Sequence, residues 1–544
     1  MKKTVVLGLD GATWKLLKPF AEKGWMPTIK KILEKGVWGE LESTIPPMTA
    51  TSWTSFATGK NPQKHGLFDF MIPVNSLGNM RFASSDDIHD KTIYELVKEH
   101  GKTPITINLP ETWPPKLPND ITITSLLTQG DQWIFPESVK QECPALQKYR
   151  LTPNESLRLK DRREEYIADL LLHLNEQVEG VKQLFIKKPW DFFFYLFSHT
   201  DWISHLAFCE LIEKEDASAR RIFETVDKHV AWFIERLPKN TNLIMLSDHG
   251  FTTYKKIFYL NRWLEQEGYL VTNTASEQFH GAATRRAKEL DKVRSKKKRI
   301  TVGSGVFKLL SAIPPLEKTA RWMYHHVLKK YLPIDLKVQT GIDFSKTKAC
   351  FPKGAYVTNI YINKSWVYKD GIVSKEEYPK LVAELVEKLK NLKDTEGKPV
   401  IAQVLTRDEV YGSEAPDKAP DIFFELNDYW LVGHFQSYNL FGKNIENKHA
   451  KMGVFMAYGP DFAQGKQVEG FRMPDITPLI LHLMNIPIPS DCDGKVHREA
   501  LADSSEAKKR TIQFGAPSAR TTGQQNAPIS EKQTIKSALG KIKL

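Results

Sequence analysis

The chain has 544 residues, of which 41% are hydrophobic and 26% are charged, as in a soluble globular protein with a large core. Its net charge of +12 gathers in two segments, because residues 285–299 hold nine basic and two acidic side chains and the residues after 501 are also basic. This uneven charge argues against specific nucleic-acid binding, and the widely spaced Cys143, Cys209, Cys350 and Cys492 exclude a disulfide framework and a cysteine zinc site.

Short apolar runs that end in polar or turn residues predict buried strands along much of the chain. In chain order the expected elements are strands at 4–9 and 103–109, a helix at 162–188, a strand at 191–197, a helix at 217–236, and strands at 242–246 and 452–458. Strands that alternate with helices indicate an α/β fold with a mostly parallel sheet, whose chemistry gathers at the carboxyl ends of the strands.

The same pattern divides the chain into four parts. Residues 1–264 and 337–500 are expected to form the two parts of one core, and residues 265–336 a basic inserted segment or cap near the mouth of the site. Residues 501–544 contain few large apolar side chains and predict a disordered basic tail. Within this tail, Ile535, Leu539 and Ile542 have helical spacing among lysines, which would suit a weak contact with an anionic membrane surface.

Two features near the N-terminus have both an ordinary and a catalytic interpretation. Asp10 ends the first expected strand, where an aspartate is commonly a helix cap but can also hold a cation. Residues 46–59 are rich in hydroxyl groups and open an expected helix after two prolines, so Thr49 is either a cap or a hydroxyl beside a bound anion. A threonine hydroxyl attacks phosphorus only when a base or a metal helps to ionise it.

Two Asp–His pairs follow later strands. Asp201 and His205 stand four residues apart, so on a helix they share one face. Asp248 and His249 follow the expected strand at 242–246. Each pair alone is compatible with a structural hydrogen bond, but carboxylate and imidazole together also suit a divalent cation such as zinc.

In this order, Asp10-Gly11, the segment around Thr49, Asp201 to His205, Asp248-His249-Gly250, and His449 before residues 453–460 resemble the alkaline phosphatase superfamily. Within it they are most similar to the type I phosphodiesterase and nucleotide pyrophosphatase family, over residues 3–494. The resemblance implies a three-layer α/β/α fold and two divalent metal ions, zinc or manganese. One metal would be held by Asp201, His205 and His449, and the other by Asp10, Asp248 and His249, with Thr49 between them as nucleophile and metal ligand.

Several assignments stay open on the sequence. Thr51 is the rival nucleophile, and His434 is the rival for the last ligand. Ser52 stands where the family carries a substrate-binding asparagine. No arginine lies between Met48 and Thr58 to clamp the extra charge of a monoester, so a phosphodiester or pyrophosphate substrate is expected, nucleotide or lipid-linked.

The competing functions are a phosphomonoesterase or phosphomutase of the same superfamily, and a non-catalytic binding protein at an anionic membrane surface. The sulfatase branch is not expected, because it needs a cysteine or serine for conversion to formylglycine, and the Thr49 segment holds no cysteine and lacks the proline and arginine that follow in that branch. We expect a cytoplasmic protein, with or without peripheral contact with a membrane, since cysteines are sparse and unpaired. The sequence leaves the oligomeric state undetermined.

Overall fold

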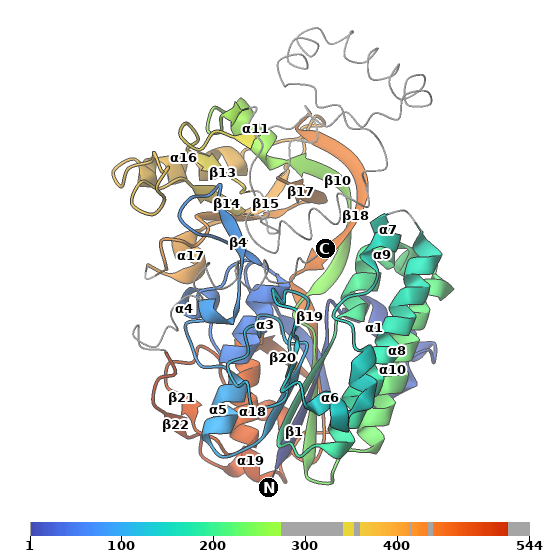
Figure 1. The fold of residues 1–544 in the computed structure, drawn as a ribbon. Helices are drawn as coiled ribbons and strands as arrows, with labels where there is room; N and C mark the ends of the chain where they lie inside the picture. Colours follow the sequence, from blue (N-terminus) through green and yellow to red (C-terminus); the bar gives the residue numbers. More distant parts are fainter. Residues whose placement is uncertain are drawn as a thin grey trace, which may run out of the picture.

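The structure is a computed structural model that describes residues 2–159, 162–273, 341–352, 359–413, 415–433 and 439–519. It has two lobes (Figure 1): a larger one built on the central sheet, and a smaller one above it that contains β13 to β17 and α16. Within the described residues, no helix combines the length and the apolar character needed to span a bilayer.

The central sheet has nine strands in the order β20-β2-β19-β9-β1-β8-β5-β6-β7. Only β19 and β7 run antiparallel to their neighbours, so the sheet is mostly parallel, as the sequence predicts. The bounds are β1 Lys3–Leu9, β2 Val37–Glu42, β5 Pro104–Ile107, β6 Thr122–Ile123, β7 Ile134–Phe135, β8 Phe192–Phe197, β9 Thr241–Leu246, β19 Met452–Tyr458 and β20 Lys466–Arg472. All five strands that the sequence predicts are therefore present within a few residues.

Helices cover both faces of this sheet because alternate side chains of each central strand point to opposite sides. In β1, Val5, Leu7 and Leu9 pack into one apolar core, whereas Val6 packs into the other. The first face is covered by α1 Trp14–Glu22, α2 Pro27–Lys35, α8 Arg163–Lys187, α9 His199–Glu213 and α10 Ala217–Glu235. The second is covered by α3 Thr49–Thr58, α5 Ile93–Glu99 and α18 Ile476–Leu483. The expected α/β/α layers are confirmed.

In its described residues, the smaller lobe has its own apolar core, the short antiparallel pair β11-β12 and two larger sheets. One sheet has the order β13-β14-β16-β15, and the other has the order β17-β10-β18 and reaches down to the larger lobe (Figure 1). The bounds are β10 Gly250–Tyr259, α11 Leu260–Gln266, β11 Thr272–Asn273, β12 Gly341–Ile342, β13 Ala349–Cys350, β14 Asn359–Ile362, α16 Tyr378–Lys390, β15 Ile401–Thr406, α17 Arg407–Tyr411, β16 Ile422–Leu426, β17 Tyr429–Val432 and β18 Phe441–Ala450.

The remaining strands and α-helices of the described chain are short. They are β3 Met71–Pro73, β4 Met80–Phe82, α4 Pro62–His65, α6 Val139–Glu142, α7 Glu155–Leu159, β21 Ile488–Pro489, α19 Glu506–Lys509 and β22 Phe514–Gly515. The basic run at 285–299 and the helical spacing at 535–542 lie outside the described residues.

One predicted boundary needs correction. The sequence predicts a disordered tail from residue 501, but residues 501–519 lie against the larger lobe. Leu501 and Ala507 are buried in its core, and β22 pairs with β21. The Asp491 carboxylate accepts hydrogen bonds from the backbone N–H groups of Ser518 and Ala519. This segment is therefore held by core packing, strand pairing and hydrogen bonds together, which its low apolar content does not reveal.

Candidate metal centre and active site

Three adjacent parallel strands carry acidic residues to one edge of the central sheet. Asp10 directly follows β1, Asp201 lies in the first turn of α9 after β8, and Asp248 follows β9. Because β9, β1 and β8 are neighbours and run the same way, their carboxyl ends meet at this edge. His449 arrives from β18, which is paired with β10 so that His449 faces Phe251.

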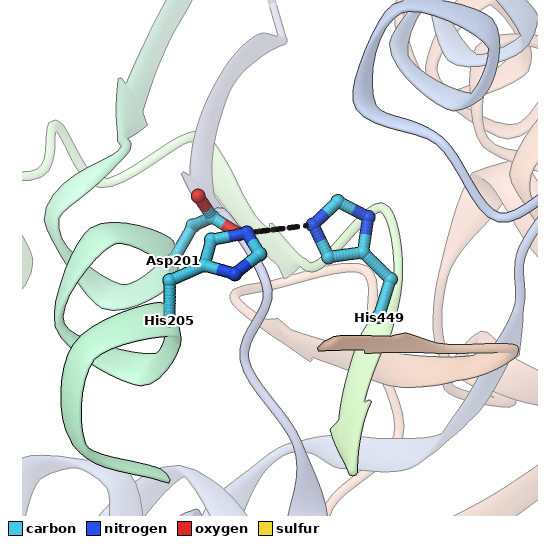
Figure 2. Close-up of side chains that lie close together, drawn as sticks. All are labelled: Asp201, His205 and His449. Carbon is cyan, nitrogen blue, oxygen red and sulfur yellow. Dashed lines mark hydrogen bonds and ion pairs between the residues drawn. The ribbon is translucent and has the colours of Figure 1, made fainter. Parts of the chain in front are cut away.

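Asp201, His205 and His449 form the first cluster, as the resemblance implies (Figure 2). The Nε2 atoms of His205 and His449 each lie 3.4 Å from Asp201 Oδ1 and 3.0 Å from one another. The i,i+4 spacing on α9 places Asp201 and His205 on one side, and β18 brings His449 to face them. One carboxylate and two imidazoles thus converge on a point at which a cation could bind.

Asp10, Asp248 and His249 lie directly beside this cluster. His249 Nε2 is 3.3 Å from Asp248 Oδ2 and 3.7 Å from Asp10 Oδ1. Asp201 also groups with Asp10 and His249, so its carboxylate lies between the two sets of ligands. Gly11, with φ +65°, donates its N–H to Asp248 Oδ1 at 3.2 Å, and a Cβ at this position would lie 2.6 Å from the Phe251 ring. The close packing here therefore requires glycine.

Backbone carbonyls fix the three imidazoles in one tautomer. Each Nδ1–H donates to a carbonyl oxygen: His205 to Asn447 at 3.1 Å, His249 to Gly250 at 3.0 Å, and His449 to Pro47 at 3.2 Å. Every Nε2 therefore presents a lone pair to the centre, which is the arrangement of metal-binding histidines. In the neutral form, the imidazoles of His205 and His449 would turn two Nε2 lone pairs toward one another at 3.0 Å, and a cation beside them would relieve this repulsion.

Burial adjusts the ionisation of the same side chains. It lowers the pKa of His205 and of His249 to about 3, so both imidazoles are neutral at pH 7. Burial, together with the neighbouring Asp248 and Asp201, raises the pKa of Asp10 well above its usual value, and burial raises that of Asp248 to about 6. Neutral imidazoles beside crowded carboxylates are the donors that a divalent cation requires.

Three buried carboxylate oxygens are left without a hydrogen-bond donor among the described residues: Asp10 Oδ1, Asp201 Oδ1 and Asp248 Oδ2. Such oxygens are costly in a protein interior unless something compensates for their charge. With the Nε2 lone pairs they form a nitrogen and oxygen donor set of the kind that binds zinc or manganese. The residues present therefore fit two divalent cations.

Thr49 is the first residue of α3 and its hydroxyl reaches the ligand cluster. Thr49 Oγ1 lies 3.3 Å from His249 Nε2. Met48, which precedes α3, makes no side-chain cap, so within the described part of the chain the first backbone N–H groups of α3 can face an anion. Thr51, the rival nucleophile, is fully buried, and its hydroxyl contacts no polar partner among the described residues. Only Thr49 of the two contacts a candidate ligand.

Ser52 lies deeper, within a chain of hydroxyl groups. Its Oγ lies 2.8 Å from Ser43 Oγ and 2.9 Å from Thr44 Oγ1, and Thr44 Oγ1 donates to the carbonyl oxygen of Pro46 at 2.7 Å. Since Thr44 uses its proton on Pro46, Ser52 donates to Thr44 and accepts from Ser43. These contacts hold the loop before α3 and favour a structural role. Substrate binding by Ser52 stays a prediction.

The residues that orient the ligands were not predicted from the sequence. Pro47 and Asn447 act through their backbone carbonyls, for which a sequence carries little signal. Asn447 has one detectable feature, its position two residues before His449 on the same face of β18. His434, the rival ligand, lies outside the described residues, whereas His449 lies in the cluster.

A three-layer α/β/α core with clustered Asp and His ligands beside a helix-starting threonine defines a class of metal-dependent hydrolases. The family model described as type I phosphodiesterase / nucleotide pyrophosphatase matches residues 4–450. The chain therefore belongs to this family, within the alkaline phosphatase superfamily, and is a hydrolytic enzyme.

Comparison with other proteins gives distant matches. No curated protein sequence matches the chain significantly. A phosphonoacetate hydrolase from Sinorhizobium meliloti, in complex with phosphonoformate, superposes with a TM-score of 0.51 at 13% identity, over 89% of this chain and 95% of that chain. Murine ectonucleotide pyrophosphatase / phosphodiesterase 5, as an inactive variant in complex with AMP, superposes with a TM-score of 0.49 at 14% identity. The match covers 92% of this chain and 100% of that chain. The likeness to the hydrolase supports the fold.

Proposed function

We propose that this enzyme cleaves phosphodiester or pyrophosphate bonds with Thr49 as nucleophile and with two divalent cations. The observation that carries the proposal is the convergence of six Asp and His side chains at one edge of the sheet, where His249 Nε2 lies 3.3 Å from Thr49 Oγ1 and three buried carboxylate oxygens lack donors among the described residues. A structural cluster of this kind would contain its own cations or donors. This one has the composition of a site that takes its positive charge from bound metal.

The ligands divide into the two sets that the resemblance implies. Asp201, His205 and His449 would hold one cation, and Asp10, Asp248 and His249 the other. When bound, the two cations supply a lowered pKa for the attacking hydroxyl and positive charge beside the oxygens of the substrate. The mixed nitrogen and oxygen donors suit zinc first and manganese second.

Thr49 carries the covalent step. Its Oγ1 forms a bond to phosphorus while the bond to the leaving oxygen breaks, and the proton of the hydroxyl ends on the leaving group. The product is a phosphothreonine that still carries the second substituent of a diester substrate, and water then cleaves the new ester to release a phosphomonoester and regenerate the hydroxyl. The backbone N–H that follows Thr49 belongs to the uncapped first turn of α3, where it can donate to a phosphoryl oxygen. Thr49 is 6% exposed, so the helix start holds its side chain with little freedom.

The preference for a diester follows from charge. A monoester brings one more negative charge than a diester to the same phosphorus, and enzymes commonly meet it with a guanidinium group. The Thr49 segment, from Met48 to Thr58, contains no arginine. The six ligands include three carboxylates, which also disfavour the more highly charged substrate. A nucleotide or a lipid-linked diester is the proposed substrate class.

Metal analysis and a substrate panel test this proposal. We expect about two divalent ions per chain in the purified enzyme and faster hydrolysis of bis(p-nitrophenyl) phosphate than of p-nitrophenyl phosphate, with a dinucleotide pyrophosphate as third substrate. A chelator should abolish all three activities, and zinc should restore them. Full turnover after complete removal of metal would refute the two-cation mechanism, and a monoester cleaved far faster than both other substrates would refute the diester preference.

A further inference from the structure

Helix α9 is broken immediately after it supplies two metal ligands. It runs from His199 to Glu213 and carries Asp201 and His205, but Ala207 has non-helical backbone angles, φ −142° and ψ 20°. Sharp breaks in helices have identifiable causes, and one of them is a side chain that inserts into the ladder of backbone hydrogen bonds. The break lies two residues beyond His205, so whatever fixes its geometry also fixes the direction of that imidazole.

The side chain at this break is Asn447 of β18. Its Oδ1 accepts a hydrogen bond from the Cys209 backbone N–H at 3.2 Å, and its Nδ2 donates to the His205 backbone carbonyl at 3.5 Å. An unbroken α-helix would join these same two groups, since residue 209 donates to residue 205. The amide of Asn447 therefore takes the place of a peptide unit between the two halves of α9.

Asn447 also contacts the ligand directly. Its backbone carbonyl accepts the Nδ1–H of His205 at 3.1 Å, which leaves Nε2 of His205 facing the cluster. The Thr253 hydroxyl donates to Asn447 Oδ1 at 3.0 Å from the opposing strand β10, and this anchors the amide. Asn447 is 8% exposed. Two residues further along the same strand face stands His449, the ligand that closes the cluster.

We infer that Asn447 is a positioning residue that sets the distance between the His205 and His449 imidazoles and so determines affinity for the cation held with Asp201. The inference rests on the proposed function. Asn447 binds both ends of the break in α9 with its side chain and orients His205 with its backbone, while its own strand carries His449. Among the described residues, its hydrogen bonds reach His205, Cys209 and Thr253 and none reaches Thr49 or the Asp10, Asp248 and His249 set, so we expect it to act on one cation of the two.

Zinc titration against a chromophoric chelator, with the full-length enzyme, tests this role. In Asn447→Ala we expect one zinc ion to bind about 10- to 100-fold more weakly than in the wild type, while the other keeps its affinity. Activity should fall at limiting zinc and recover with excess zinc. Asn447→Asp keeps the acceptor for Cys209 and Thr253, so its zinc affinity should lie between those of the wild type and Asn447→Ala. Thr253→Val should lose less zinc affinity than Asn447→Ala.

Asn261→Ala is the matched control. Asn261 is also a buried asparagine whose amide makes three hydrogen bonds to backbone, with Phe351 and Gly433, but it lies in the smaller lobe. The Asn261→Ala substitution should lower the melting temperature of the enzyme without changing its affinity for either zinc ion. If Asn447→Ala and Asn447→Asp bind both ions as tightly as the wild type, the inference is overturned and Asn447 serves stability alone. If the wild type itself binds no zinc or manganese, the proposed function fails first, and this inference with it.

Discussion

The two lobes each bury a group of charged side chains, and the two groups are balanced in different ways. In the smaller lobe, the fully buried Lys364 ammonium lies 2.7 Å from the fully buried Asp421 carboxylate. Asp421 also accepts from the Ile362 backbone N–H at 2.7 Å and from the Tyr378 hydroxyl at 2.8 Å. In the larger lobe, Asp10, Asp201 and Asp248 each keep one buried oxygen that no described residue satisfies.

The difference separates a cluster that serves the fold from one that serves a ligand. A buried ion pair with its remaining hydrogen bonds made is complete within the protein. A buried group of carboxylates and neutral imidazoles is incomplete, and it persists only when the surrounding structure or a bound cation compensates for it. Substitutions in the two clusters should therefore have different and, at one position, opposite consequences.

The largest effect is expected at the nucleophile. Thr49→Ala should lower kcat by about 10⁴-fold, while both metal ions remain bound, because among the described residues no other hydroxyl lies within hydrogen-bond distance of a ligand side chain. Thr49→Ser should keep part of the activity, since it offers the same oxygen with a less restricted rotamer. Steady-state kinetics together with metal analysis measures both. Thr51→Ala is the control and should lower kcat less than about tenfold. A larger loss of kcat in Thr51→Ala than in Thr49→Ala would make Thr51 the nucleophile.

The next largest effect should fall on stability, in the smaller lobe. Lys364→Met leaves the Asp421 carboxylate buried without its cation and should lower the free energy of unfolding by about 3–5 kcal/mol. Metal affinity should not change. The exposed pair Lys388–Glu267, at 2.8 Å, provides the control, and Lys388→Met should cost about 0–1 kcal/mol. Urea denaturation of the metal-loaded proteins compares them, and equal losses would show that the buried pair is not special.

Metal binding should depend on pH more strongly at one site than at the other. Asp248 has a pKa of about 6 and that of Asp10 is raised well above its usual value, so protons compete with the metal for these carboxylates as the pH falls through 6. We expect affinity at this site to fall about tenfold per pH unit for each proton displaced. His205 of the other site has a pKa of about 3 and takes up no proton in this range. Zinc titrations at pH 5 and 7.5 should show one affinity changing much more than the other, and equal changes would contradict the assignment.

The smallest expected effect is a gain in stability in Asp10→Asn, whereas Lys364→Met should lose stability. The folded-state pKa of Asp10 lies above its unfolded value, so the metal-free protein loses stability as pH rises from about 4 through the folded pKa. Asp10→Asn removes this ionisation and should stabilise the chelator-treated protein at pH 7.5 by about 1 kcal/mol. Thermal denaturation in a chelator measures the difference. A clear loss of stability would mean that the Asp10 carboxylate is already satisfied within the fold.

The sequence revealed the centre of the fold better than its edges. The wholly buried strands β1, β8 and β9 appear as apolar runs, whereas β2 alternates buried and exposed residues and was not predicted. The Asp–His pairs were visible as polar residues at strand ends, but only the family resemblance assigned them to two metal sets. The hydrogen bonds of Asn447 and of the Pro47 carbonyl depend on strand register and on a helix break, which local sequence does not encode.

The central claim is that Thr49 becomes phosphorylated during turnover. Rapid acid quenching of the enzyme with a ³²P-labelled diester, followed by mapping of the labelled peptide, tests it directly, because the phosphothreonine ester, which still carries the second substituent of the diester, survives the acid. The account predicts label on Thr49 in the wild type and none in Thr49→Ala. Label on Thr51, or turnover with no labelled peptide at all, would contradict it and favour the other hydroxyl or direct attack by water.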